Sequence, residues 1–153
     1  MLTVKRHAAS KDRKPTEYLL GRDIKMLSPV MIYKITSEGF AYQDVQEMVS
    51  VSVLLSSQKV MSRIVGRSVR TLQRHGGKKQ ANLDAKQSAV ALQYAKVLEH
   101  AMSVFGTQQL AEEWLSRPCK FLEGNIPLEM IDNPVGFQAV EDYLTRIEHG
   151  VYQ

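Results

Sequence analysis

Apolar residues recur along most of this chain at the three- and four-residue spacing of amphipathic helices, and strand-like alternation is almost absent. The longest pattern runs from about residue 83 to about residue 105. Shorter helical patterns follow Gly39 and Gly106, and another runs from Pro134 to about residue 149. The sequence therefore predicts an all-α fold. The apolar stripe of the longest predicted helix consists of Val90, Tyr94, Val97, Leu98, Ala101 and Phe105.

Polar caps and glycines mark the ends of these predicted helices. Asp84 lies where a carboxylate stabilises the start of the longest helix, and Gly106 is placed to end it. Thr107 can cap the next helix, in which we expect Trp114 to be a core residue. Residues 18–38 leave two interpretations open: a helix that starts at Ser28-Pro29, or a strand-like run over VMIYKI.

Residues 56–77 have the pattern of a helix–turn–helix. We expect Ser56 or Ser57 to cap a first helix and Gly66 to end it, before Ser68 caps a second. Arginine and glutamine side chains, which can bond base edges, are left for the outer face of the second helix. The alternative is a helical hairpin that only packs and carries arginines for solubility. The predicted DNA-binding residues are Arg67, Ser68, Arg70, Thr71, Gln73 and Arg74.

Charge is divided unevenly between the two halves of the chain. Residues 1–80 carry 15 Lys and Arg against 6 Asp and Glu, a net charge of +9. Residues 81–153 carry 5 against 10, a net charge of −5. The basic half suits a phosphate backbone, whereas the acidic half suits a protein partner.

No catalytic or metal-binding constellation is visible in the sequence. Cys119 is the only cysteine, nucleotide-binding glycine loops are absent, and the acidic pairs Glu112-Glu113 and Glu141-Asp142 are expected to lie on solvated faces. We therefore expect no enzyme activity, no cofactor and no metal. The N-terminal segment has no apolar core of a secretory signal, and no apolar run is long enough to span a bilayer, so we expect a cytoplasmic location. The four histidines, which lack metal-ligand spacing, are His7, His75, His100 and His149.

Residues 56–153 resemble the Xre/MbcA/ParS toxin-binding antitoxin family. The resemblance is carried, in the family's order, by VGRSVRTLQRH, a long helix ending in VFG, EEWLSRP, FLEGNIPLEMI and GFQAVEDYLTRIEHGVY. It implies an Xre-type helix–turn–helix domain joined to a helical toxin-binding domain. It also implies the antitoxin of a type II toxin–antitoxin system, which occludes a RES-type, NAD-consuming toxin and represses its own operon.

Three regions follow from these observations: a flexible basic arm (1–17), a helix–turn–helix DNA-binding and dimerisation region (18–80), and a toxin-binding domain (81–153). The expected partners are a cognate RES-domain toxin, operator DNA and a second copy of the chain. The competing function is a stand-alone dimeric helix–turn–helix transcription regulator. The toxin-binding residues are expected at the C-terminal end, for which a frayed tail is the alternative. They are Glu148, His149, Gly150, Val151, Tyr152 and Gln153.

Overall fold

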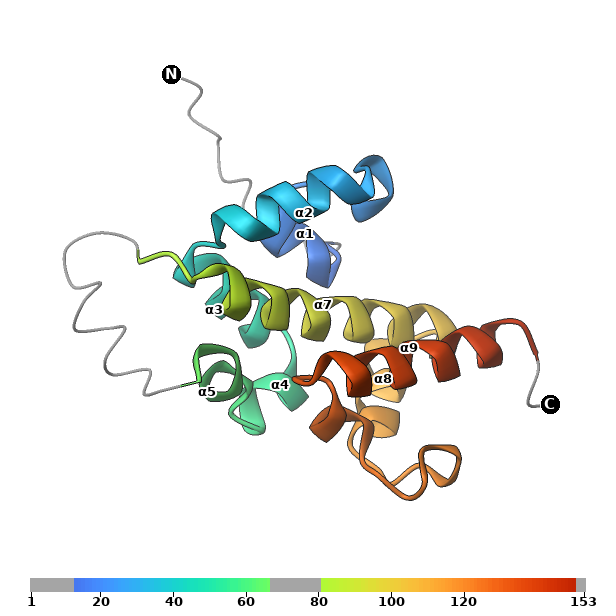
Figure 1. The fold of residues 1–153 in the computed structure, drawn as a ribbon. Coiled ribbons are helices and arrows are strands. Elements are labelled where there is room, and N and C mark those ends of the chain that lie inside the picture. Colours follow the sequence, from blue (N-terminus) through green and yellow to red (C-terminus); the bar gives the residue numbers. More distant parts are fainter. Residues whose placement is uncertain (1–12, 67–80, 151–153) are drawn as a thin grey trace.

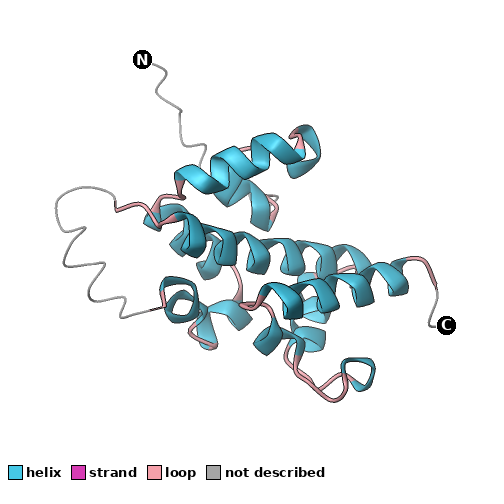
Figure 2. Cartoon of the chain, viewed as in Figure 1, coloured by secondary structure: helices cyan, strands magenta, loops and turns pink. Residues whose placement is uncertain are grey.

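The computed structural model describes residues 13–66 and 81–150, and these residues are helical with no β-strand, so the all-α prediction is confirmed (Figures 1 and 2). Two isolated backbone bridges, Ala41 with Asn82 and Cys119 with Asn125, join loops. None of the helices in this part of the chain is long and apolar enough to cross a membrane. The helices are α1 (Pro15–Leu20), η1 (Ile24–Met26), α2 (Pro29–Glu38), α3 (Tyr42–Ser50), α4 (Val53–Ser57), α5 (Val60–Val65), α7 (Ala85–Phe105), α8 (Gln108–Leu115), η2 (Lys120–Leu122), η3 (Pro127–Met130) and α9 (Pro134–Glu148).

Helix α7 is the central element of the fold. It packs against α1, α2 and α5 from the first half of the chain and against α8 and α9 from the second half (Figure 1). Its start is fixed by a capping box, in which the Asp84 carboxylate accepts the Gln87 N–H at 2.7 Å and the Gln87 side chain accepts the Asp84 N–H. Gly106 ends α7 in the left-handed conformation, as the sequence predicts.

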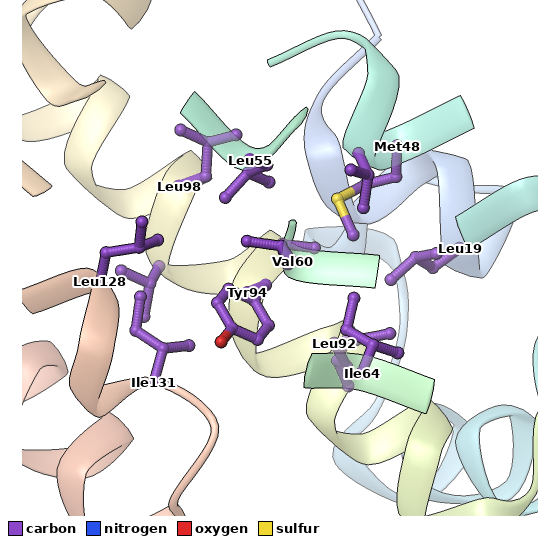
Figure 3. Packing of buried hydrophobic residues seen from close by; sticks show 14 of the residues in the cluster. Leu19, Met48, Leu55, Val60, Ile64, Leu92, Tyr94, Leu98, Leu128 and Ile131 are labelled. Carbon is purple, nitrogen blue, oxygen red and sulfur yellow. The ribbon is translucent and has the colours of Figure 1, made fainter. Parts of the chain in front are cut away.

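One hydrophobic cluster extends over both halves of the chain. Met48 and Val60 of the first half lie in the same cluster as Tyr94 and Leu98 of α7 and Ile131 beyond η3 (Figure 3). All five side chains are almost completely buried. The two regions predicted on either side of residue 80 therefore share a hydrophobic core.

The flexible arm was predicted for residues 1–17, but its last residues, from Pro15 onward, belong to helix α1. Pro15 and Thr16 are buried in the first turn of α1. The Thr16 N–H and hydroxyl both donate to the Glu99 carboxylate of α7, at 3.1 and 2.7 Å, which attaches α1 to the central helix. The open question over residues 18–38 is decided in favour of a helix, because Ser28 Oγ accepts the Met31 N–H at the start of α2.

The first helix of the predicted helix–turn–helix begins at a different residue in the structure than the sequence predicts. Ser56 and Ser57 lie inside α4, where their hydroxyls donate to the carbonyls of Val49 and Leu54, so the prediction that one of them caps the helix is wrong. Helix α5 instead begins after Lys59, a non-glycine residue in the left-handed conformation. Its end at Gly66 is as predicted. The sequence shows no sign of this break, because lysine rarely adopts a positive φ and nothing in the local sequence indicates it.

Close packing also fixes the start of α9. Asn133 caps it by accepting the N–H groups of Val135 and Gly136, and Pro134 occupies the first turn. A Cβ atom at Gly136 would overlap the Met130 carbonyl oxygen, so glycine is required where α9 crosses the end of η3. Helix α9 then packs against α7, and its Val140 is completely buried in the core.

Candidate functional site

The described part of the predicted toxin-binding segment is the C-terminal end of α9. Glu148 is the last residue of this helix and His149 is its C-cap. Gly150 follows in the left-handed conformation and donates its N–H to the Ile147 carbonyl at 2.9 Å. Val151, Tyr152 and Gln153 lie outside the described residues.

The end of α9 is held against α7 by a histidine between two carboxylates, which we call the His100 clasp. His100 Nδ1 lies 2.7 Å from a Glu141 carboxylate oxygen, and His100 Nε2 lies 2.9 Å from a Glu148 carboxylate oxygen. Both ring nitrogens face acceptors, so the imidazolium satisfies both contacts as a donor. The side chains of His100 and Glu141 are less than one-fifth exposed, whereas that of Glu148 is about half exposed.

The hydrogen bonds of the clasp favour its charged form, in which His100 is protonated and Glu148 is ionised. The hydrogen bond with Glu141 is the largest cause of a raised pKa at His100, opposed by burial and reinforced by Glu148. The pKa of Glu148 is lowered, chiefly by its hydrogen bond from His100. One oxygen of Glu141, Oε1, is buried without a hydrogen-bond partner. The clasp therefore places one imidazolium between two carboxylates where α9 ends.

The His100 clasp lines a cavity of about 560 Å³, and three lysine side chains line the same cavity. Lys14 lines it from the start of α1, Lys25 from η1 and Lys96 from α7. The Lys14 ammonium is paired with Asp23 at 3.2 Å, and Lys96 lies over the Phe137 ring at 5.7 Å. The described residues contain no cluster of histidine, cysteine or acidic side chains arranged to hold a metal ion.

A second feature of this region is a run of aromatic rings, here called the aromatic ladder. Phe105 and Trp114 lie 5.4 Å apart between ring centroids, and Trp114 and Tyr143 are stacked at 5.7 Å. Tyr143 is stacked in turn with Phe121 at 5.7 Å. Trp114, expected in the core, is partly buried and packs against the core from the ladder.

The acidic pairs predicted to be solvated are partly engaged instead. Glu141 belongs to the clasp, and Glu112 accepts the Ser52 hydroxyl at 2.6 Å, close to the N-terminus of α4. These roles were missed because both partners are distant in sequence. The seven-residue spacing of Glu141 and Glu148, which places them on one face of a helix, was the only local signal.

The predicted DNA-binding residues lie outside the described part of the chain. This applies to Arg67, Ser68, Arg70, Thr71, Gln73 and Arg74.

The clasp and the ladder lie within a region of the chain that resembles a known protein family. Residues 100–150 match the family model described as the antitoxin Xre/MbcA/ParS C-terminal toxin-binding domain. A relative named Antitoxin Xre, from Photorhabdus laumondii, is 32% identical over 90 residues, which are 58% of this chain. This match covers 60% of the relative's length. The resemblance to the Xre/MbcA/ParS antitoxin family inferred from the sequence is thus confirmed, and for residues 100–150 it is to the C-terminal toxin-binding domain of that family.

Proposed function

We propose that this chain is the antitoxin of a type II toxin–antitoxin pair, and that its C-terminal region binds a protein toxin and covers the toxin's active site. The observation that carries the proposal is the match of residues 100–150 to a toxin-binding domain. Occlusion requires no catalytic group in the antitoxin, only a surface that fits the toxin.

The finer proposal is that the toxin is a RES-type enzyme that consumes NAD, as the family resemblance implies. A cleft for a dinucleotide is lined with cations, because its phosphates are anionic. Residues 81–153 carry a net charge of −5, so long-range attraction favours this encounter. Glu148 and the partial negative charge at the C-terminal end of α9 would meet those cations.

Truncation tests this assignment. Deleting residues 149–153 keeps Glu148 and the His100 clasp, so it should leave thermal unfolding nearly unchanged while releasing toxicity on co-expression with the cognate toxin. The exposed substitution Val135→Ala, at the opposite end of α9, is the matched control and should neutralise normally. Normal growth with the truncated antitoxin and a toxin verified as active would place neutralisation elsewhere, on the surface formed by residues 114–130.

We further propose that residues 18–80 bind the operator and dimerise. Arg70→Ala with Arg74→Ala should weaken operator binding and reduce its dependence on salt, while leaving toxin neutralisation intact. Operator binding as tight as that of the wild type at moderate salt would contradict the recognition-helix assignment.

The dimer proposal is supported by apolar side chains on and beside α2. Met26, Val30 and Tyr33 are 78%, 62% and 70% exposed, which is unusual for neighbouring large apolar residues. Light scattering that shows only monomer at high micromolar concentration would overturn it. The stand-alone regulator remains the alternative function, and co-purification of the toxin with tagged chain separates the two.

A further inference from the structure

Phe121 stands out among the exposed apolar side chains of residues 100–150. It is 58% exposed, yet its ring is stacked on Tyr143, which is stacked in turn on Trp114. The ladder joins α7, α8, η2 and α9, and the Phe121 ring rests on Tyr143 of α9, which is itself held by Trp114 of α8. An exposed ring held in this way loses little conformational freedom when a partner covers it.

The backbone that carries Phe121 is also well fixed. Cys119 donates its N–H to the Asn125 carbonyl at 3.0 Å, and the Gly124 N–H returns to the Cys119 carbonyl at 2.9 Å. The Asn125 side chain donates to the Leu122 carbonyl at 2.8 Å. Cys119 and Leu122 are buried on either side of Phe121, so the short loop is anchored at both ends while the ring lies outside.

This ring is close to the end of α9 that the proposed function assigns to the toxin. Tyr143, on which Phe121 stacks, precedes Glu148 by five residues, or about 7.5 Å along a helix axis. The η2 loop and the end of α9 lie toward the same side of the molecule (Figure 1). Tyr143 and Glu148 point about 140° apart around α9, so a partner covers both by reaching around the end of this helix.

We propose that Phe121 is the apolar anchor with which this region docks on its toxin, inserting into an apolar hollow at the rim of the cleft that the end of α9 covers. This inference rests on the proposed function. Buried aromatic side chains dominate the binding energy of many protein interfaces, especially where the ring is already held in its bound position.

The charge of residues 100–150 favours a protein toxin, rather than nucleic acid or a second copy of the chain, as the partner that covers Phe121. Residues 100–150 contain 3 Lys and Arg and 8 Asp and Glu, a net charge of −5. This charge repels nucleic acid, and it also repels the same region of a second copy. The fitting partner is a protein whose apolar hollow is bordered by arginine or lysine, which agrees with a cleft that binds an anionic dinucleotide.

The test compares Phe121→Ala with Val135→Ala in the full chain. Val135 is 78% exposed and also lies within residues 100–150, but it is in the first turn of α9, so it controls for loss of exposed apolar surface. Affinity for the purified toxin is measured by calorimetry, and folding is checked by thermal unfolding and by the fluorescence of Trp114, the only tryptophan. Phe121→Ala should raise the Kd by at least about 30-fold, as for an interface hot spot, whereas Val135→Ala should change it less than about 3-fold.

Other outcomes decide against the anchor or against the proposed function on which it rests. A folded Phe121→Ala variant that binds toxin within about 3-fold of wild type refutes it while the proposed function stands. If that variant instead changes only the oligomeric state, the ring serves contact between copies. Wild-type chain that fails to bind the toxin overturns the proposed function itself. Should Phe121→Ala prove unfolded, Phe121→Leu, which keeps an apolar side chain in the loop, is read against the same limits.

Discussion

The bond between Ser52 and Glu112 joins the two halves of the chain, and its removal should destabilise the whole fold. Ser52 is the fully buried N-cap of α4. Its oxygen accepts the Leu55 N–H at 3.1 Å, and its hydroxyl donates to the Glu112 carboxylate of α8 at 2.6 Å. Ser52→Ala removes both bonds at once.

The expected magnitude follows from these two contacts. Loss of an N-cap costs about 0.5–2 kcal/mol, and loss of a hydrogen bond to a charged group costs about 1.5–3 kcal/mol. Because Glu112 retains its bond from Gln108 and some contact with solvent, we expect a total near the lower end, about 2 kcal/mol. For a chain of this length, that loss lowers the melting temperature by about 4–8 °C.

A double-mutant cycle in urea tests whether the contact itself is responsible. Ser52→Ala and Glu112→Ala should be non-additive by more than about 0.5 kcal/mol, whereas Ser52→Ala and Glu113→Ala should be additive within that limit. Additivity of the first pair would refute the reasoning. Two separate unfolding transitions in the wild type would show that the halves do not unfold together, despite their shared core.

Three further outcomes are expected. Leu144→Ala, at a fully buried position of α9, should destabilise by about 2–5 kcal/mol in urea unfolding, and a loss below 1 kcal/mol would contradict its core role. Gly136→Ala should cost about 1–3 kcal/mol by the same measurement, because the new methyl group meets the Met130 carbonyl, and an unchanged midpoint would show that α9 can shift freely. His100→Gln should destabilise most between the ordinary glutamate pKa of 4.5 and the ordinary histidine pKa of about 6.5. The folded pKa of His100 is raised and that of Glu148 is lowered, so the stabilisation is lost as the pH rises through the folded pKa of His100 and as it falls through the folded pKa of Glu148. Melting temperatures measured from below to above about pH 6.5 check the direction of this effect. A difference in melting temperature between variant and wild type that grows as the pH rises past this value would refute it.

Features encoded by neighbouring residues were predictable from the sequence. The start of α2 at Ser28-Pro29, the end of α7 at Gly106 and the cap of α8 at Thr107 each depend on residues within one turn. Such signals act locally, because a cap bonds backbone groups only two or three positions away. The all-α class followed from them and from the periodicity.

Features that depend on how helices pack were not predictable in this way. His100 and Glu148 are 48 residues apart, and Ser52 and Glu112 are 60 apart. Whether such side chains meet is decided by the rotation and crossing of whole helices, which are set by the shared core rather than by local propensity. The break at Lys59 was missed for a related reason, since tertiary packing can impose a left-handed conformation on a residue that does not favour it.

The His100 clasp changes what Glu148 can contribute to the proposed mechanism. A free carboxylate at the end of α9 would offer a full negative charge to the toxin, but Glu148 already accepts a hydrogen bond from His100. With His100 protonated, the two carboxylates and the imidazolium together carry a net charge of −1, and one Glu148 oxygen is already bonded to His100, so an arginine of the toxin would share the carboxylate with His100. Substitution of Glu148 therefore removes a contact within the antitoxin together with any contact to the toxin. Truncation after Glu148 leaves the clasp intact and isolates the contribution of the terminal residues, whereas substitution of His100 frees Glu148 without deleting it. Neutralisation that survives loss of His100 but not loss of Glu148 would assign the carboxylate to the toxin; loss of neutralisation in both variants would assign it to holding α9 in place.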